Sequence, residues 1–302
     1  MTAPSRPVLG LTLGDPAGIG PEIVRACLAD AQLPRQCEYR VIGTSEGFAP
    51  GKPDPASARA SWDGLKEAAT LLGNKEIAGV VTGPVSKEGL HAAGFPFPGQ
   101  TEFFAARSGT DNYAMCLTGG PLTVGLVTIH VPLRDVPRLL KKEEIVRTGK
   151  LLAGFVRRRA GREPRIAVAG LNPHAGEAGL FGGEEKEIIA PAVEELASAG
   201  NFSGPHSPDT VFHRAAQGEF DAVLCMYHDQ GLIPLKLLAF DQGVNVTLGL
   251  PYPRTSPDHG TAFDIAGTGR ANHESMMAAI KLAVELLAKS CSESQKISDF
   301  VA

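Results

Sequence analysis

The sequence predicts an α/β protein of about two domains with mostly parallel sheets. Its 302 residues exceed the usual length of one domain, and 43% of them are hydrophobic, which is enough for a sizeable core. Short apolar, β-branched runs alternate with segments of helical periodicity along the whole chain. Several runs are unbroken, as is typical of parallel strands covered by helices on both faces.

The strands and helices are expected in a regular order. Eight apolar runs predict strands at 8–13, 39–42, 77–81, 114–117, 122–129, 166–169, 222–226 and 244–248. Helical spacing between and after them is shown by Trp62, Leu65, Ala69 and Leu72, and by Met277, Ile280, Val284 and Leu287. Pro21 after a glycine-rich turn predicts a helix that ends near Asp30. Two prolines in 51–57 predict a loop.

Charge and composition exclude several classes of function. The chain has 29 Lys and Arg against 33 Asp and Glu, so it lacks the basic excess that binds nucleic acid or an anionic membrane. No apolar run reaches the roughly 18 residues that span a bilayer, and Met1 to Pro7 has no apolar core of a signal peptide. Five cysteines without C-x-x-C spacing argue against a disulfide framework. We therefore expect a cytoplasmic enzyme that acts on a small molecule.

Three histidines occupy equivalent places after predicted strands. His130 ends LTVGLVTIH, His174 ends RIAVAGLNPH and His228 ends DAVLCMYH. Ligands of open α/β sheets bind at the carboxyl ends of strands, so the three rings could converge there. Three imidazoles with a fourth position open are a typical catalytic zinc arrangement, and other divalent ions also accept imidazole. A single strand-end histidine, by contrast, is more often a hydrogen-bonded structural residue.

Two glycine-rich segments are candidate anion or nucleotide loops. The first, LGDPAGIGPE at 13–22, places glycines at the start of a helix, where backbone N–H groups favour an anion. A purely structural turn explains it equally well, because the spacing is not G-x-G-x-x-G. The second, DHGTAFDIAGTGRAN at 258–272, is long enough to wrap a nucleotide, although glycine turns alone do not establish this.

Six motifs in order cover nearly the whole chain: GDPAGIGPE, TGPVSKEGL, GQTEFFA, LNPHAGE, YHDQGLIPLK and HGTAFDIAGTG. Together they resemble the 4-hydroxythreonine-4-phosphate dehydrogenase family of pyridoxal phosphate biosynthesis, which is related in fold to isocitrate and isopropylmalate dehydrogenases. The resemblance implies a homodimer. It implies that each subunit has two α/β/α domains with a cleft between them, and that the active site in the cleft is shared with the partner subunit. We place the first domain at 1–120 plus 240–302 and the second at 121–239.

The resemblance also implies roles for individual residues. The metal ligands are His130, His174 and His228. The substrate contacts are Gln100, Thr101, Lys236, Asn245 and Arg254. The contacts of NAD or NADP are Gly14, Asp15, His259, Gly260, Thr261, Asp264 and Gly267. Without the resemblance, Lys236 and Arg254 would be taken for ordinary surface charges. Candidate proton-transfer or site-tuning groups are Lys87, Asp209 and Asp229, with a helix N-cap as the alternative for Asp209.

The reaction implied is oxidation of 4-phosphooxy-L-threonine by NAD or NADP with a zinc, magnesium or cobalt ion, followed by decarboxylation to 3-amino-2-oxopropyl phosphate. Many family members have histidine where this chain has Gln100, and glutamine cannot carry a proton or a positive charge. That difference leaves 4-phospho-D-threonate, 4-phospho-D-erythronate or a dihydrodiol carboxylate open as substrates. A metal-dependent hydrolase or lyase is the alternative from another class, but it would not need the 258–272 loop.

Overall fold

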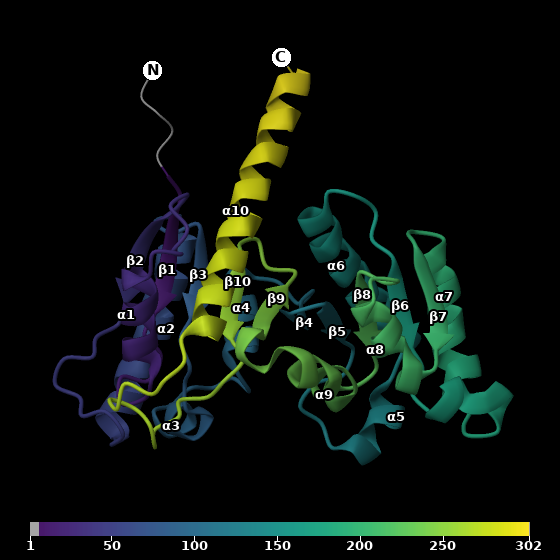
Figure 1. The fold of residues 1–302 in the computed structure, drawn as a ribbon, viewed down its shortest axis with the longest axis horizontal. Coiled ribbons are helices and arrows are strands. Elements are labelled where there is room, and N and C mark those ends of the chain that lie inside the picture. The colour runs from purple at the N-terminus through teal and green to yellow at the C-terminus, as the bar shows by residue number, and fades with distance from the viewer. Residues whose placement is uncertain (1–5, 302) are drawn as a thin grey trace. The chain divides into compact units, whose positions relative to one another are not determined.

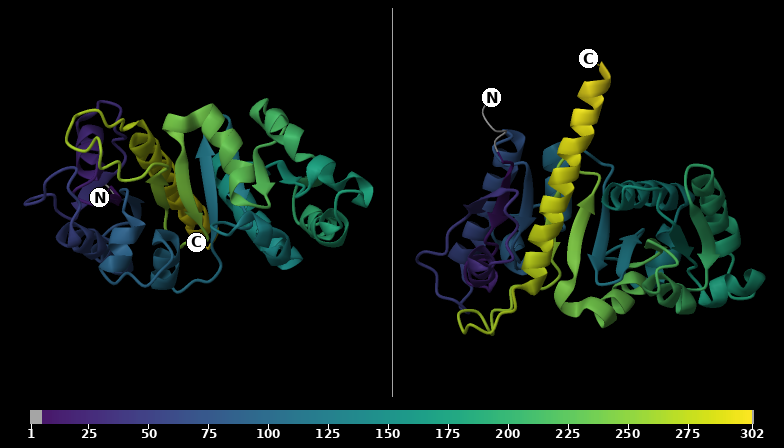
Figure 2. Two further views of the ribbon diagram at one scale, coloured as in Figure 1. Left: turned by 90° about the horizontal axis from the view of Figure 1, so that it is seen from below. Right: turned by 45° about the horizontal axis from the view of Figure 1, so that its top comes forward.

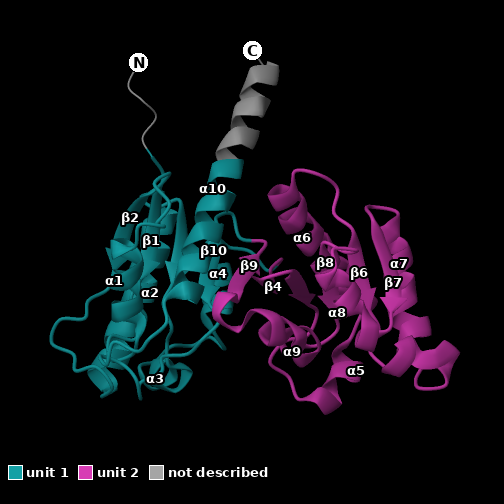
Figure 3. Ribbon diagram, viewed as in Figure 1, with its two compact units in different colours: residues 1–111, 250–302 teal, residues 112–249 magenta. Residues whose placement is uncertain are grey.

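The computed structural model describes residues 6–301, with side chains up to residue 289, and the chain divides into two compact units (Figure 3). The first unit is Met1–Asp111 with Leu250–Ala302, and the second is Asn112–Gly249. The division expected from the sequence put strands β4 (Ala114–Gly119) and β9 (Val244–Leu248) in the first domain. In the structure both strands lie in the second unit. The two strands pair with each other, and β4 also pairs with β5 of that unit, which explains their place.

The first unit contains four parallel strands in the order β2 (Glu38–Ile42), β1 (Val8–Thr12), β3 (Gly79–Thr82) and β10 (Arg254–Pro257). Helix α2 (Pro55–Gly73) packs on one face together with α3 (Lys87–Ala92) and α4 (Gln100–Ser108). Helix α10 (Glu274–Val301) packs on β10 and β3 and contacts α1 (Gly20–Ala29) (Figure 1). Helices therefore cover the sheet as the unbroken apolar strands predicted.

Local sequence explains where two of these helices begin. Helix α1 starts at Gly20 with Pro21 in its first turn and ends at Ala29, which confirms the prediction. Helix α2 starts at Pro55, so the expectation of a loop over 51–57 is wrong for its last three residues. The reason is a capping box: Asp54 Oδ1 accepts from Ser57 N at 2.7 Å, and Ser57 Oγ accepts from Asp54 N at 3.2 Å.

The second unit contains six strands in the order β9, β4, β5 (Leu122–Leu126), β8 (Ala222–Cys225), β6 (Ile166–Ala169) and β7 (Phe202–His206). Strands β5, β8, β6 and β7 run parallel to one another, whereas β4 runs antiparallel to both of its neighbours, β5 and β9. Helices α6 (Lys142–Ala160) and α7 (Ala190–Ala197) cover one face, and α8 (Pro208–Ala216) and α9 (His228–Ala239) cover the other (Figure 2). Shorter helical elements are Leu133–Asp135, Val136–Leu139, Pro173–Gly179, Glu185–Ile189 and Phe240–Gln242.

These elements confirm the predicted α/β class with mostly parallel strands. All eight predicted strands are present, but β5 ends at Leu126, three residues earlier than expected. Strands β7 and β10 were missed because Ser-Gly-Pro-His and Arg-Thr-Ser-Pro are not apolar runs. Strand β10 is nevertheless buried, and Thr255 Oγ1 donates to the carbonyl of Ala279 in α10 at 2.9 Å. None of the described helices is both long and apolar enough to cross a membrane.

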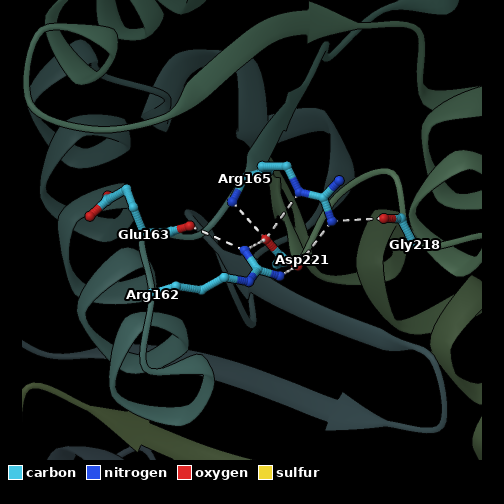
Figure 4. Close-up of polar contacts among 5 residues, drawn as sticks. All are labelled: Arg162, Glu163, Arg165, Gly218 and Asp221. Atoms are coloured by element: carbon cyan, nitrogen blue, oxygen red, sulfur yellow. Dashed lines mark hydrogen bonds and ion pairs between the residues drawn. The ribbon is translucent and has the colours of Figure 1, made fainter.

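A carboxyl group clamps the beginnings of β6 and β8 in the second unit (Figure 4). Asp221 accepts from Arg162 Nη2 at 2.6 Å, from Arg162 Nη1 at 2.9 Å and from Arg165 N at 2.7 Å. Asp221 N donates in turn to the carbonyl of Arg165 at 2.8 Å. The Arg162 guanidinium holds the pKa of Asp221 well below its usual range. The clamp lies at the amino ends of these strands, so it supports the sheet from the end opposite the histidines.

We expect Asp221→Asn to lower the free energy of unfolding by about 2 kcal/mol at neutral pH, since hydrogen bonds to charged groups each contribute about 1.5 to 3 kcal/mol. A carboxyl with a lowered pKa stabilises the fold above its unfolded pKa and loses this effect as the pH falls below about 4. Denaturant unfolding at pH 7 and at pH 3 measures both effects. The matched control is Glu163→Gln, which alters the more exposed pair with Arg157. If the free energy of unfolding of Asp221→Asn differed from that of wild type by the same amount at pH 7 and at pH 3, this account would be contradicted.

Candidate active site

The three strand-end histidines all lie in the second unit and follow neighbouring parallel strands. His130 follows β5, His228 is the first residue of α9 after β8, and His174 follows β6. Because β5 pairs with β8 and β8 pairs with β6, the three strand ends meet at one edge of the sheet. The rings of His130 and His228 have centroids 5.5 Å apart. The structure thus brings two of the predicted ligands together and places the third at the same edge.

His228 has the partner that a metal-binding histidine usually has. Its Nδ1 lies 2.7 Å from Asp229 Oδ1, a contact that orients the ring and leaves Nε2 without this carboxylate. The tuning role of Asp229 stays a prediction. Among the side chains described, those of residues 6–289, no three His, Cys, Asp or Glu stand close enough to hold one ion. The donor chemistry of the histidine pair nevertheless suits a divalent transition metal, since imidazole nitrogen is one of its preferred ligands.

Two buried polar side chains connect the loops that carry the histidines. Gln230 Oε1 accepts from Met226 N at 2.7 Å, and Gln230 Nε2 donates to the carbonyl of Gly170 at 2.7 Å. The hydroxyl of Thr128 donates to the carbonyl of Met226 at 2.8 Å. These bonds join the carboxyl ends of β5, β8 and β6 in a single network. These hydrogen bonds therefore fix the strand ends next to His130 and His228 relative to each other and to the end of β6.

The backbone that carries His174 is strained. Five consecutive residues, 174–178, have positive φ angles between 44° and 79°, and only Gly176 among them is a glycine. A left-handed conformation costs roughly 1 to 2 kcal/mol for each residue with a Cβ atom. Surrounding contacts must hold such a turn, and strained backbone of this kind clusters at functional sites.

Asp209 lies near His174 at the beginning of α8, which follows β7. A hydrogen bond from Ser207 and, to a smaller extent, the nearby His174 lower the pKa of Asp209. The N-cap residue of α8 is Ser207, and Asp209 lies two residues further on, in the first turn of the helix. The N-cap alternative for Asp209 is therefore wrong.

The predicted substrate contacts of the second unit sit on two elements. Asn245 lies on β9, where its Oδ1 is buried without a hydrogen-bond partner among the described residues. A buried amide oxygen without a partner is costly, so it marks a place where a ligand could donate. Lys236 lies on α9 and is half-buried.

Arg254 is the central polar residue of the first unit's candidate site. Its side chain is buried in β10 with 3% of the residue exposed, so the interpretation as an ordinary surface charge is wrong. Arg254 Nη2 donates to Thr82 Oγ1 at 2.6 Å and to Gln100 Oε1 at 3.1 Å. Burial lowers the pKa of Arg254 to about 10, so the guanidinium remains cationic near neutral pH.

The start of α4 lies beside this arginine. Gln100 and Thr101 are its first two residues, and the negative charge of Glu102 opposes the burial effect on Arg254. Gln100 uses its carbonyl oxygen toward Arg254, which leaves the amide NH₂ as its donor. Lys87, in contrast, is exposed at the first position of α3.

The two glycine-rich segments of the first unit touch each other although about 240 residues separate them. Ile19 N donates to the carbonyl of Thr261 at 2.9 Å, and Gly267 N donates to Glu22 Oε1 at 3.3 Å. A Cβ atom on Gly18 would lie 2.9 Å from the Thr261 oxygen, so only glycine permits this approach. Two of the predicted cofactor residues, Thr261 and Gly267, therefore contact the glycine-rich segment 13–22, which also contains Gly14 and Asp15.

Two other residues of the predicted cofactor set differ in exposure. Asp15 is 2% exposed, and its Oδ1 accepts from Ala17 N at 3.0 Å. Burial raises the pKa of this carboxyl. His259 lies just after β10, where its Nδ1 is 3.2 Å from the carbonyl of Gly260. The buried Asp15 carboxyl is thus suited to stabilise the turn through its hydrogen bond from Ala17 N. Residues exposed to solvent lie in the 258–272 loop.

Sequence reasoning missed the residues that support the site. Gln230 stands within the YHDQGLIPLK motif but was not singled out, and a buried glutamine two residues after a candidate ligand is a usable signal. Thr82, Thr128 and Glu185 carry no such signal. Their roles depend on residues that are distant in sequence.

Comparison with known proteins identifies the class and then the family. A β-decarboxylating dehydrogenase from Thermococcus kodakarensis has a TM-score of 0.53 at 16% identity, over 93% of this chain and 84% of that one. This likeness shows the fold alone and confirms the expected dehydrogenase-type architecture. The family model of the pyridoxal phosphate biosynthetic protein PdxA matches residues 22–283, so the chain belongs to this family.

Two of the similar proteins, at 45% and 39% identity to this chain, are 4-hydroxythreonine-4-phosphate dehydrogenases. The chain is 45% identical over 325 residues to a 4-hydroxythreonine-4-phosphate dehydrogenase of Geobacter metallireducens, covering 93% of this chain and 96% of that protein. It is 39% identical to the 4-hydroxythreonine-4-phosphate dehydrogenase of Klebsiella pneumoniae, whose crystal structure gives a TM-score of 0.81 over 93% of this chain and 99% of that one. The family resemblance and the oxidoreductase class predicted from the sequence are confirmed.

Proposed function

We propose that this protein oxidises the secondary alcohol of 4-phosphooxy-L-threonine and transfers the hydride to NAD or NADP. The observation that carries the proposal is the meeting of His130, His228 and His174 at one edge of the second unit's sheet. We assign one divalent ion, zinc, magnesium or cobalt, to these three residues. When bound, the ion supplies a Lewis acid that lowers the pKa of the substrate alcohol. The ketone product is a β-keto acid, and loss of carbon dioxide gives 3-amino-2-oxopropyl phosphate.

The chain's own residues orient the ligands and the substrate. Asp229 fixes the ring of His228 through Nδ1, and Asp209 provides a carboxylate near His174 that can hold or accept a proton. Arg254 supplies a fixed positive charge for the substrate phosphate, with Thr101 as an uncharged donor. In the second unit, Lys236 and Asn245 are the proposed substrate contacts. The 258–272 loop and the turn at Gly14 and Asp15 are proposed to bind the nicotinamide nucleotide.

The test is NADH or NADPH formation, followed by absorbance, with 4-phosphooxy-L-threonine, 4-phospho-D-threonate, 4-phospho-D-erythronate and a dihydrodiol carboxylate. Each substrate is assayed with and without a metal chelator. We expect the highest kcat/KM for 4-phosphooxy-L-threonine and loss of activity with the chelator. A flat trace for every substrate would refute the proposed substrate and the proposed nicotinamide cofactor.

Gln100 is the residue that we expect to tune substrate choice. Its carbonyl oxygen accepts from Arg254, whereas a protonated histidine at that place would repel the guanidinium. We therefore expect Gln100→His to change the ratio of kcat/KM for 4-phosphooxy-L-threonine and 4-phospho-D-erythronate, most strongly below about pH 6.5 where histidine is charged. Gln217→His, on an exposed residue after α8, is the control. Unchanged ratios and pH profiles would mean that Gln100 carries no substrate information.

We propose that a second copy of the chain covers an apolar surface on α9 and the turn after it. Ile233 and Leu237 lie one helical turn apart on α9, and Phe240 begins the turn that follows; Leu237 and Phe240 are 83% and 72% exposed. Exposed apolar side chains of this size are typical of a subunit interface. This surface supports the homodimer, with shared active sites, that the family resemblance implies.

Charge placed on this surface should dissociate the dimer. We expect Leu237→Glu combined with Phe240→Glu to shift the protein to monomers and to reduce activity, because two charges would be buried at the interface. Sedimentation velocity and an activity assay at the same concentration measure this. Leu28→Glu on α1 is the control, because it adds one charge in the first unit. A wild-type monomer with full activity would contradict the proposal.

A further inference from the structure

Glu185 is a buried carboxyl group outside the proposed catalytic set. It begins the π-helix Glu185–Ile189 and is 6% exposed. Its Oε1 accepts from the backbone N–H groups of Leu171 and Asn172 at 2.8 and 2.7 Å, and its Oε2 accepts from Asn172 Nδ2 at 3.0 Å. All three donors belong to the two residues that precede the turn of His174. The carboxyl group therefore fixes the entry to that turn.

The backbone of the His174 turn also lies close to the Glu185 carboxyl group. A Cβ atom on Gly176 would lie 2.6 Å from Glu185 Oε2, so the backbone at Gly176 passes directly beside the carboxyl. A Cβ atom on Gly170 would lie 3.3 Å from Glu185 Oε1 and 2.9 Å from the Cα of Ala175. Glu185 is thus enclosed by the end of β6 on one side and by the left-handed residues on the other.

The remaining hydrogen bonds of the turn are local and few. Ala175 N donates to the carbonyl of Asn172 at 3.1 Å, and Phe181 N donates to that of Gly176 at 3.2 Å. Bonds within the turn do not fix its position relative to the sheet. Asn172 Nδ2 also donates to Glu184 Oε2 at 2.9 Å, but this second carboxyl contacts no backbone N–H of Leu171 or Asn172 in the bonds described. The geometry assigns the anchoring contact to Glu185.

We propose that Glu185 is a positioning residue that holds residues 174–178 in the left-handed conformation and thereby places His174 for ion binding. The role of His174 as a ligand rests on the proposed function, whereas the anchoring of the turn does not. Loss of the three accepted hydrogen bonds lets the non-glycine residues relax toward right-handed backbone. The His174 ring then leaves the sheet edge, while His130 and His228 keep their place through Thr128 and Gln230.

The experiment compares Glu185→Ala and Glu185→Gln with the exposed neighbour variant Glu187→Ala. Hydrogen exchange of peptides that cover residues 170–176 reports on the turn, and titration with Co²⁺ alone reports on the ligands. We expect Glu185→Ala to speed exchange at Leu171 and Asn172 and to weaken Co²⁺ binding about 10- to 100-fold, the range typical of residues that orient metal ligands. Glu185→Gln should lie between alanine and wild type, because its amide oxygen can still accept two N–H bonds. Glu187→Ala should match wild type.

Hydrogen exchange tests whether Glu185 anchors the turn, and Co²⁺ titration tests whether this anchoring places His174. Unchanged exchange in Glu185→Ala would overturn the anchoring role, and faster exchange with unchanged Co²⁺ affinity would overturn the positioning of His174. A wild-type protein that binds no Co²⁺ would refute the metal site of the proposed function and with it the positioning role, while hydrogen exchange still decides the anchoring. If Glu185→Ala does not fold, Glu185→Gln is judged by the same two measurements.

Discussion

Arg254→Ala should raise the KM for the phosphorylated substrate by roughly 10- to 100-fold and leave the KM for NAD nearly unchanged. Charge-assisted hydrogen bonds to a buried anion contribute about 1.5 to 3 kcal/mol each, and alanine removes both the charge and the donors. Steady-state kinetics with each substrate varied in turn measures the two constants. Arg254→Lys should recover only part of the effect, because an ammonium cannot donate to Thr82, Gln100 and a phosphate with the geometry of a guanidinium.

A matched control separates recognition from folding. Arg107→Ala removes an exposed guanidinium from α4 that lies over the ring of Phe103, 5.5 Å from its centroid. It should leave both Michaelis constants unchanged, and thermal unfolding shows whether either variant loses stability. Equal increases in both constants for Arg254→Ala would mean that this arginine is structural.

Replacing His130, His174 or His228 by alanine should lower the bound metal and reduce kcat/KM by more than about 100-fold, while the fold survives. Each variant removes one imidazole ligand, and loss of a ligand exceeds the 10- to 100-fold effect of losing a residue that only orients one. Elemental analysis after dialysis and circular dichroism measure the two expectations. His213→Ala, on an exposed position of α8, is the control. Wild-type metal content in all three variants would refute the assignment.

Comparing the activity of Asp229→Asn with that of His228→Ala tests whether Asp229 only orients the His228 ring. Asp229→Asn keeps a side chain beside His228 Nδ1 but removes the negative charge, so its effect should be smaller than that of His228→Ala. An effect as large as that of His228→Ala would mean that Asp229 itself acts in proton transfer.

Local sequence patterns were enough to predict the α/β class, eight of the strands, and the place of three histidines just after strand ends. Local patterns carry this information, because an unbroken apolar run predicts a buried parallel strand and its polar end predicts the sheet edge. The family resemblance came from consecutive residues as well. These features need no knowledge of which strands are neighbours.

Which strands are neighbours could be seen in the folded chain alone. His130 and His228 are 98 residues apart in the chain, and the pairing of β5 with β8 brings their rings to 5.5 Å. Arg254 stands in a polar strand without an apolar pattern, and its burial follows from packing between Thr82 and α4. Glu185 resembles its exposed neighbours in sequence, yet it accepts hydrogen bonds from residues 13 and 14 positions earlier. Hydrogen bonds between distant residues depend on the whole fold, and no local pattern encodes them.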